Sequence, residues 1–198
     1  MTLFSSKRNT VYLDEGVVIK ECKNHEAARS EGEFLDALRL KGVAVPIVTG
    51  VERNTLRLEY IDGKPLPDFL ESNDAVIRCS EVSRQIIDWF VSFYDAVDYK
   101  NTKEIRGDIN GRNFIITDNG VFGVDFEEHT FGRRETDLGR LLAYISSYSY
   151  ADTTAQNIMK EKLLAGFILR LCPDKNLLLA DKTKEIEEIK KRRGGNLI

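Results

Sequence analysis

The sequence predicts an α+β protein in which a strand-rich N-terminal part precedes a mainly helical C-terminal part. Short β-prone runs are concentrated in the first 60 positions, at Val11–Leu13, Val17–Lys20, Ile47–Gly50 and Thr55–Tyr60. Beyond them, apolar residues recur at helical spacing over 82–97, over 136–145 and in the last third of the chain. A length of 198 residues allows one domain with a large core, or two small lobes that share a cleft.

The overall composition is that of a globular protein, with 42% hydrophobic and 31% charged residues. The net charge of −3 gives no reason to expect direct nucleic-acid binding. No apolar run is long enough for a membrane span, and the N-terminus lacks the apolar core of a signal peptide, so no membrane partner is expected. The cysteines are odd in number and far apart, which is typical of free thiols in a reducing cytoplasm, and they are Cys22, Cys79 and Cys172.

The strongest functional pattern lies in the sequence IRGDINGRNFIITDNGVFGVDFEE. It predicts a hairpin of strands 114–117 and 121–124, because the Asn-Gly pair between them accepts positive φ at low cost. Such a hairpin holds Asn113 and Asp125 at the same end of two paired strands. An amide oxygen and a carboxylate suit Mg²⁺, and Asp108 stands just before them in the chain. An ordinary surface hairpin with solvated acids is the alternative.

A second candidate group is a lysine with an acidic partner. Lys20 ends the apolar run VVIK, and a helix is expected over Glu26–Leu40. The apolar face of that helix is expected to contain Ala27, Phe34, Leu35 and Leu38. The acidic residues that could pair with the lysine are Glu26, Glu31 and Glu33. Without further context, a solvated lysine and solvated surface acids explain this pattern as well.

The motif RGDINGRN followed by VDF resembles the catalytic core of the protein-kinase-like superfamily, in which a loop Asp precedes an Asn by five residues and an Asp-Phe pair follows. The Gly before Asp108 and the Asp-Phe-Glu ending are more similar to the aminoglycoside phosphotransferase and choline kinase branch. The resemblance covers Val17–Ile145 and implies a two-lobed fold. Residues 1–62 would form a nucleotide-binding N-lobe of about five strands and one helix. Residues 63–198 would form a mainly helical C-lobe with the catalytic loop and the metal site.

The resemblance also implies roles for individual residues. Asp108 would be the catalytic residue that takes the proton of an acceptor hydroxyl, and Asn113 and Asp125 would bind the Mg²⁺ that accompanies ATP. Lys20 would hold the α- and β-phosphates of ATP. Glu31 is the expected partner of this lysine, because the pattern ExxxLxxL…GVxVP aligns its first Glu there.

The segment LRLEYIDGKPL resembles the link between the lobes that carries adenine on its backbone. It implies that the carbonyl of Glu59 and the amide of Ile61 face the adenine edge. Asp137 matches the family's Asp that braces the catalytic loop through backbone amides. Two departures stand out: SSKRNT replaces a glycine-rich loop, which leaves phosphate contacts to the amides of Ser5–Asn9, and Arg106 replaces the usual His.

The short loop after the Asp-Phe-Glu motif and the TDLG helix favour an ATP-dependent phosphotransferase that acts on a hydroxyl of a small molecule. One alternative is a compact atypical Ser/Thr protein kinase or ATPase that resembles the kinase of the tRNA threonylcarbamoyl-modification complex. A pseudokinase that binds without turnover is a third class. The basic cluster Lys190–Arg193 suits the negative end of a helix dipole, and a protein partner at that helix is the alternative.

Overall fold

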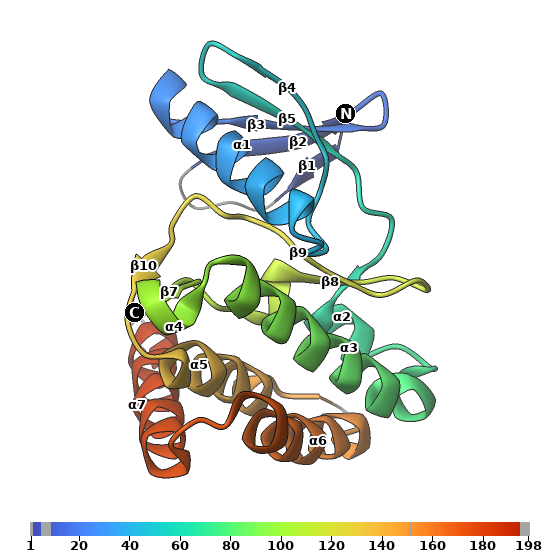
Figure 1. The fold of residues 1–198 in the computed structure, drawn as a ribbon. Coiled ribbons are helices and arrows are strands. Elements are labelled where there is room, and N and C mark those ends of the chain that lie inside the picture. The colour runs from blue at the N-terminus through green and yellow to red at the C-terminus, as the bar shows by residue number, and fades with distance from the viewer. Residues whose placement is uncertain (1, 5–8, 151, 195–198) are drawn as a thin grey trace.

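The computed structural model describes residues 2–4, 9–150 and 152–194. One end of the molecule is an antiparallel sheet of five strands in the order β1-β2-β3-β5-β4. Its strands are β1 (Thr2–Phe4), β2 (Thr10–Asp14), β3 (Val17–Glu21), β4 (Val48–Glu52) and β5 (Thr55–Glu59). Helix α1 (His25–Leu40) packs against β4 and β5 (Figure 1). The four strands predicted by residue range and the helix between β3 and β4 are therefore present, and β1 completes a five-stranded sheet.

Local chemistry explains how this part of the chain folds. Glu15 and Gly16 both have positive φ, 48° and 82°, which is the backbone that a tight β2–β3 hairpin requires. Helix α1 begins after Asn24, whose side-chain oxygen accepts a hydrogen bond from the amide of Ala27. The prediction that Ala27 lies on the apolar face is wrong, because this cap turns it outward and Ala28 is buried instead.

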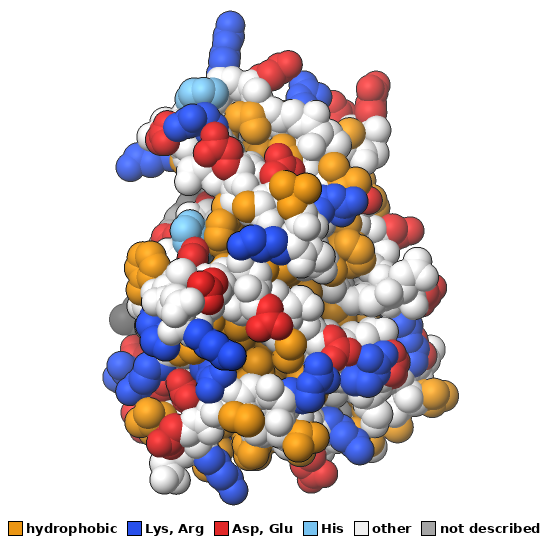
Figure 2. All heavy atoms as spheres, viewed as in Figure 1, with side chains coloured by type: hydrophobic (Ala, Val, Ile, Leu, Met, Phe, Trp, Pro, Cys, Tyr) orange, Lys and Arg blue, Asp and Glu red, His pale blue; other side chains and the backbone are white. Residues whose placement is uncertain are grey.

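The other end of the molecule is mainly helical (Figure 1). Its helices are α2 (Leu66–Leu70), α3 (Ala75–Ala96), α4 (Tyr99–Thr102), α5 (Arg134–Ser147), α6 (Thr154–Leu171) and α7 (Lys175–Gly194). Helix α3 packs against α6, and α5 packs along α7. None of the helices in the described ranges combines the length and hydrophobicity needed to cross a membrane. Figure 2 shows Lys and Arg side chains gathered over this helical end.

Between the two ends lies a small sheet in the order β6-β8-β9, made of β6 (Lys64–Pro65), β8 (Phe114–Ile116) and β9 (Val121–Gly123). Strands β8 and β9 form the predicted hairpin, with Phe114 opposite Gly123. A second small sheet pairs β7 (Glu104–Ile105) with β10 (Thr130–Phe131). The segment that leads from the hairpin to α5 runs between the five-stranded sheet and the helices (Figure 1).

One buried aromatic residue joins these parts. Trp89 of α3 stacks on Phe93 with ring centres 5.4 Å apart and meets Phe114 edge-on at 5.2 Å. Its indole nitrogen donates a hydrogen bond of 2.9 Å to the carbonyl of Ala44, which also accepts one from the amide of Gly123. A Cβ at Gly123 would lie 2.3 Å from the indole, so only glycine permits this approach of the hairpin to α3.

Candidate active site

The base of the β8–β9 hairpin brings together Asp108, Asn113 and Asp125. The amide of Val124 donates a 2.9 Å hydrogen bond to the carbonyl of Asn113, which fixes Asp125 beside the start of β8. The side-chain amide nitrogen of Asn113 donates to the backbone carbonyl of Asp108 at 3.2 Å. Asn113 is buried, whereas Asp108 and Asp125 are exposed. This arrangement leaves the amide oxygen of Asn113 and the carboxylate of Asp125 as candidate metal ligands.

Both groups fit a magnesium ion, since they supply oxygen ligands of the kind that Mg²⁺ prefers. Within the described ranges, no group of three or more His, Cys, Asp or Glu side chains could hold a metal ion. A metal here would therefore also need oxygens from phosphate and water. The backbone of Asp125 has φ of 64°, a left-handed conformation that is uncommon outside glycine and is often found at functional sites.

Lys20 lies at the centre of a cluster of carboxylates. Its ammonium nitrogen is 2.9 Å from Glu31, 2.7 Å from Asp125 and 3.5 Å from Glu127. Burial lowers the pKa of Lys20, but the charges of Glu31 and Asp125 more than reverse this, so the net pKa is raised and the ammonium stays charged. Burial raises the pKa of Glu31, and this is opposed by the lysine and by a 3.0 Å hydrogen bond from the amide of Phe126. Of the three acids proposed as partners of the lysine, Glu31 is the one in contact with it, whereas Glu26 and Glu33 pair with exposed Arg29.

Arg106 packs beneath the site and is only 1% exposed. One of its terminal nitrogens donates hydrogen bonds of 2.5 Å to the carbonyls of Val124 and Asp125, and the other has no hydrogen-bond partner among the described residues. Its guanidinium carbon lies 3.9 Å from the centre of the Phe126 ring. Burial lowers the pKa of Arg106, against nearby carboxylates that raise it. Arginine at this position therefore supports the backbone of Val124 and Asp125 directly from below.

Asp137 braces the catalytic loop as the resemblance implied. It is fully buried and accepts hydrogen bonds from the amides of Arg106 and Gly107 at 2.8 and 2.9 Å, and from the hydroxyl of Tyr94 at 3.2 Å. Burial raises the pKa of Asp137 to about 6, although all these donors favour the charged form.

The residues expected to hold the nucleotide base lie at the junction of the two parts of the molecule. Glu59 is the last residue of β5, where it is paired with Val17 of β3, and its amide donates to the carbonyl of Ile47 at 2.8 Å. Ile61 follows in the link to β6. The adenine contacts of Glu59 and Ile61 stay a prediction. Phosphate contacts were expected from the amides of Ser5–Asn9, and residues 5–8 of this range lie outside the described residues. The side chain of Asn9 donates a hydrogen bond to Glu127.

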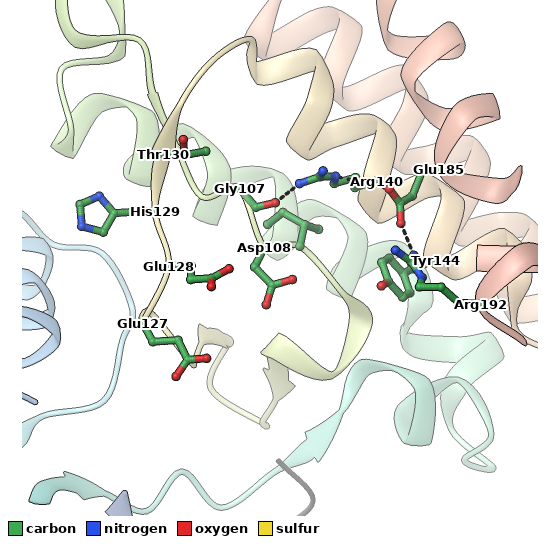
Figure 3. A pocket seen from close by; sticks show the side chains of 11 residues that line it. Gly107, Asp108, Glu127, Glu128, His129, Thr130, Arg140, Tyr144, Glu185 and Arg192 are labelled. Atoms are coloured by element: carbon green, nitrogen blue, oxygen red, sulfur yellow. Dashed lines mark hydrogen bonds and ion pairs between the residues drawn. The ribbon is translucent and has the colours of Figure 1, made fainter. Parts of the chain in front are cut away.

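A pocket of about 570 Å³ opens beside Asp108 (Figure 3). The catalytic loop and the segment after Phe126 form one side, with Glu128 and Asp108 lying next to each other in its centre. Helices α5 and α7 form the other side through Arg140, Tyr144, Glu185 and Arg192. Sequence reasoning did not assign these four residues to the site, because nothing in the chain signals that α5 and α7 both face Asp108, with Glu185 lying 77 positions beyond it.

A family model matches the part of the chain that contains this site. The RIO domain model matches residues 16–137, which include the lysine strand, the catalytic loop and Asp137. The chain belongs to the RIO domain family. The matched region is more than half of this RIO domain protein, and it contains all seven predicted site residues.

Individual relatives are more distant. The RIO domain protein is 24% identical over 161 residues to the "Probable serine/threonine-protein kinase BUD32 homolog" of Archaeoglobus fulgidus, which covers 81% of this chain and 73% of that one. The structure of the RIO domain protein is similar to that of a putative aminoglycoside phosphotransferase from Ralstonia eutropha JMP134. The TM-score is 0.67, the identity is 15%, and the match covers 99% of this chain and 84% of that one.

A second similar structure is the amicoumacin kinase hAmiN in complex with AMP-PNP, Ca²⁺ and Ami, with a TM-score of 0.55, 12% identity, and coverage of 85% and 72%. At these identities the two structures support the fold, which is the predicted protein-kinase-like one. The family and the curated relative support a kinase activity. They leave open whether the phosphate acceptor is a small molecule or a protein.

Proposed function

We propose that this RIO domain protein transfers the γ-phosphate of ATP to a hydroxyl group of a small molecule. The observation that carries this proposal is the pocket beside Asp108, which is bordered on one side by α5 and α7 and has a volume of about 570 Å³. Pockets of this size are typical of sites for small ligands.

The proposed roles follow from the contacts in the site. Lys20, held by Glu31, would bind the α- and β-phosphates of ATP. Asn113 and Asp125 would hold Mg²⁺, which when bound neutralises charge on the phosphates. Asp108 is exposed at the pocket, where it would orient the acceptor hydroxyl and take its proton. Positioning of the two substrates would supply most of the rate.

Further residues would support these steps. The carbonyl of Glu59 and the amide of Ile61 would carry the adenine ring by backbone hydrogen bonds. Arg106 would keep the proposed metal-binding segment in place, because it donates hydrogen bonds to the backbone of that segment. Asp137 would do the same for the catalytic loop, because it accepts hydrogen bonds from two amides of the loop.

A second candidate is a Ser/Thr protein kinase or ATPase, favoured by the match to the archaeal relative over 161 residues. The exposed basic residues Lys190–Arg193 at the end of α7 would then offer a surface for a protein partner. A pseudokinase is the least favoured class, since Lys20, Asp108 and Asn113 are all present.

The test is a screen of Mg²⁺-dependent ATP consumption against alcohols, amino sugars, hydroxy amino acids and unstructured proteins. The proposal expects a small hydroxyl compound to stimulate turnover, and Asp108→Asn to abolish the stimulation. Stimulation by proteins alone would favour the second candidate. ATP binding with no Asp108-dependent turnover for any acceptor would favour the pseudokinase.

A further inference from the structure

Helix α7 reaches the catalytic loop through one residue of α5. The guanidinium of Arg140 donates a hydrogen bond to the carbonyl of Gly107, the residue that directly precedes Asp108 (Figure 3). The opposite side of the same guanidinium, at Nε, lies 3.4 Å from the carboxylate of Glu185 on α7. Arg140 therefore connects the last helix of the described chain to the peptide bond before the proposed base.

Glu185 is well placed to hold this arginine. Its side chain is only 11% exposed, although it lies on a helix rich in solvated charges. It also accepts a 2.5 Å hydrogen bond from Arg192, which lies about two turns further along the same face of α7. The carboxylate thus lies between two guanidinium groups, in an order that runs from Arg192 through Glu185 to Arg140 (Figure 3).

The peptide that Arg140 contacts is under conformational constraint. Gly107 has φ of 77°, and its amide donates a 2.9 Å hydrogen bond to Asp137. Asp137 and Arg140 are three residues apart on α5, so one helix holds both the amide and the carbonyl of Gly107. The amide of Asp108 donates a 2.9 Å hydrogen bond to the carbonyl of Arg106. The contact at the Gly107 carbonyl therefore helps to fix the orientation of the peptide plane from which Asp108 extends.

We infer that Glu185 is a positioning residue for phosphoryl transfer, which it serves by holding Arg140 on the Gly107 carbonyl. The inference rests on the proposed function of Asp108, since it concerns the orientation of that side chain. Helix α7 is then part of the catalytic unit and not only a packing element. A partner that binds α7 would alter turnover through this contact.

The test compares Glu185→Gln with Glu188→Gln. Glu188 lies on the same helix, forms a 2.8 Å ion pair with Lys191 and is 44% exposed, so it controls for the loss of one charge from α7. The inference expects Glu185→Gln to lower kcat about 10-fold, while the KM for ATP and the urea midpoint stay close to those of Glu188→Gln. The double variant Glu185→Gln with Arg140→Gln should be no slower than Arg140→Gln alone, because both act on one contact.

Hydrogen exchange provides a readout that does not depend on turnover. Amides of the 105–113 peptide should exchange faster in Glu185→Gln and Arg140→Gln than in the wild type or Glu188→Gln. Equal exchange and equal kcat in the two glutamate variants would overturn the inference. If the wild type shows no turnover beyond that of Asp108→Asn, the proposed function is wrong. The exchange data would still decide whether Glu185 orders the loop.

Discussion

Replacement of Arg106 by leucine tests how the backbone that carries the proposed metal ligand Asp125 is supported. In the wild type the guanidinium donates two hydrogen bonds of 2.5 Å to the carbonyls of Val124 and Asp125, and it stacks 3.9 Å from the Phe126 ring centre. Leucine retains much of the apolar stem but makes none of these polar contacts. We therefore expect both lower stability and weaker binding of Mg·ATP.

The magnitude follows from the contacts that are lost. Two hydrogen bonds from a charged donor contribute about 1.5–3 kcal/mol each, and a desolvated cation–π contact adds about 2 kcal/mol. Against this, removing a buried charge returns several kcal/mol of desolvation. The net expectation is a loss of about 2–4 kcal/mol in the free energy of unfolding. The carbonyl of Asp125 loses its anchor at the same time, so the affinity for Mg·ATP should fall about 10-fold.

Urea unfolding measures the first effect and calorimetric titration the second. Arg84→Leu is the control, because Arg84 is exposed and its ion pairs with Glu81 and Asp88 should contribute less than about 1 kcal/mol. The m-value should stay unchanged in both variants. If Arg106→Leu proves as stable as Arg84→Leu, or more stable than the wild type, the cost of burying the guanidinium outweighs its contacts and the reasoning is wrong.

Three further predictions concern the metal ligand, the adenine contacts and the pH dependence of stability. Asp125→Ala should remove most Mg²⁺-dependent ATP binding, because it deletes the proposed carboxylate ligand; equal calorimetric affinities with and without Mg²⁺, in wild type and variant, would contradict this. Ile61→Pro should abolish ATP binding because proline has no amide hydrogen, whereas Glu59→Ala keeps its carbonyl and should bind nearly normally; a folded proline variant with normal affinity would place the adenine elsewhere. The pKa of Asp137 is raised from 3.8 to about 6, so its contribution to stability is fully present below pH 3.8 and is lost as the pH rises through 6. The stability difference between wild type and Asp137→Asn, measured by urea unfolding, should therefore decline from about pH 4 to pH 7; a difference independent of pH would refute this.

Local sequence chemistry was sufficient for the elements that set up the site. The Asn-Gly turn and the β-branched residues beside it specify the β8–β9 hairpin, and this hairpin alone brings Asn113 next to Asp125. The lysine strand and α1 were likewise readable from periodicity and turn residues. The choice of Glu31 over Glu26 and Glu33 came from the family pattern, because helical spacing alone does not say which acid faces the sheet.

The features that were missed depend on tertiary packing. Helix α3 begins at Ala75, whereas the apolar spacing predicted a start near Val82. The early start was missed because no side-chain cap marks it. In the sequence, Arg106 is recognisable only as a replacement of the usual His of the catalytic loop. The structure shows that its guanidinium is buried against Phe126. The contact of Glu185 with Arg140 requires α7 to fold back along α5, which no local pattern specifies.

The most direct test of the proposed mechanism is the Asp108→Asn variant, studied by nucleotide titration and by single-turnover phosphate transfer to an acceptor found in the screen. Asn keeps the size of the side chain but removes its charge and its ability to take a proton. Because Asp108 lines the pocket in which the acceptor is proposed to bind, affinity for Mg·ATP should stay within a few-fold of the wild type. The transfer rate should fall by ~10²-fold or more, the scale of a lost general base. Transfer at the wild-type rate would show that Asp108 is not the base and would contradict the mechanism.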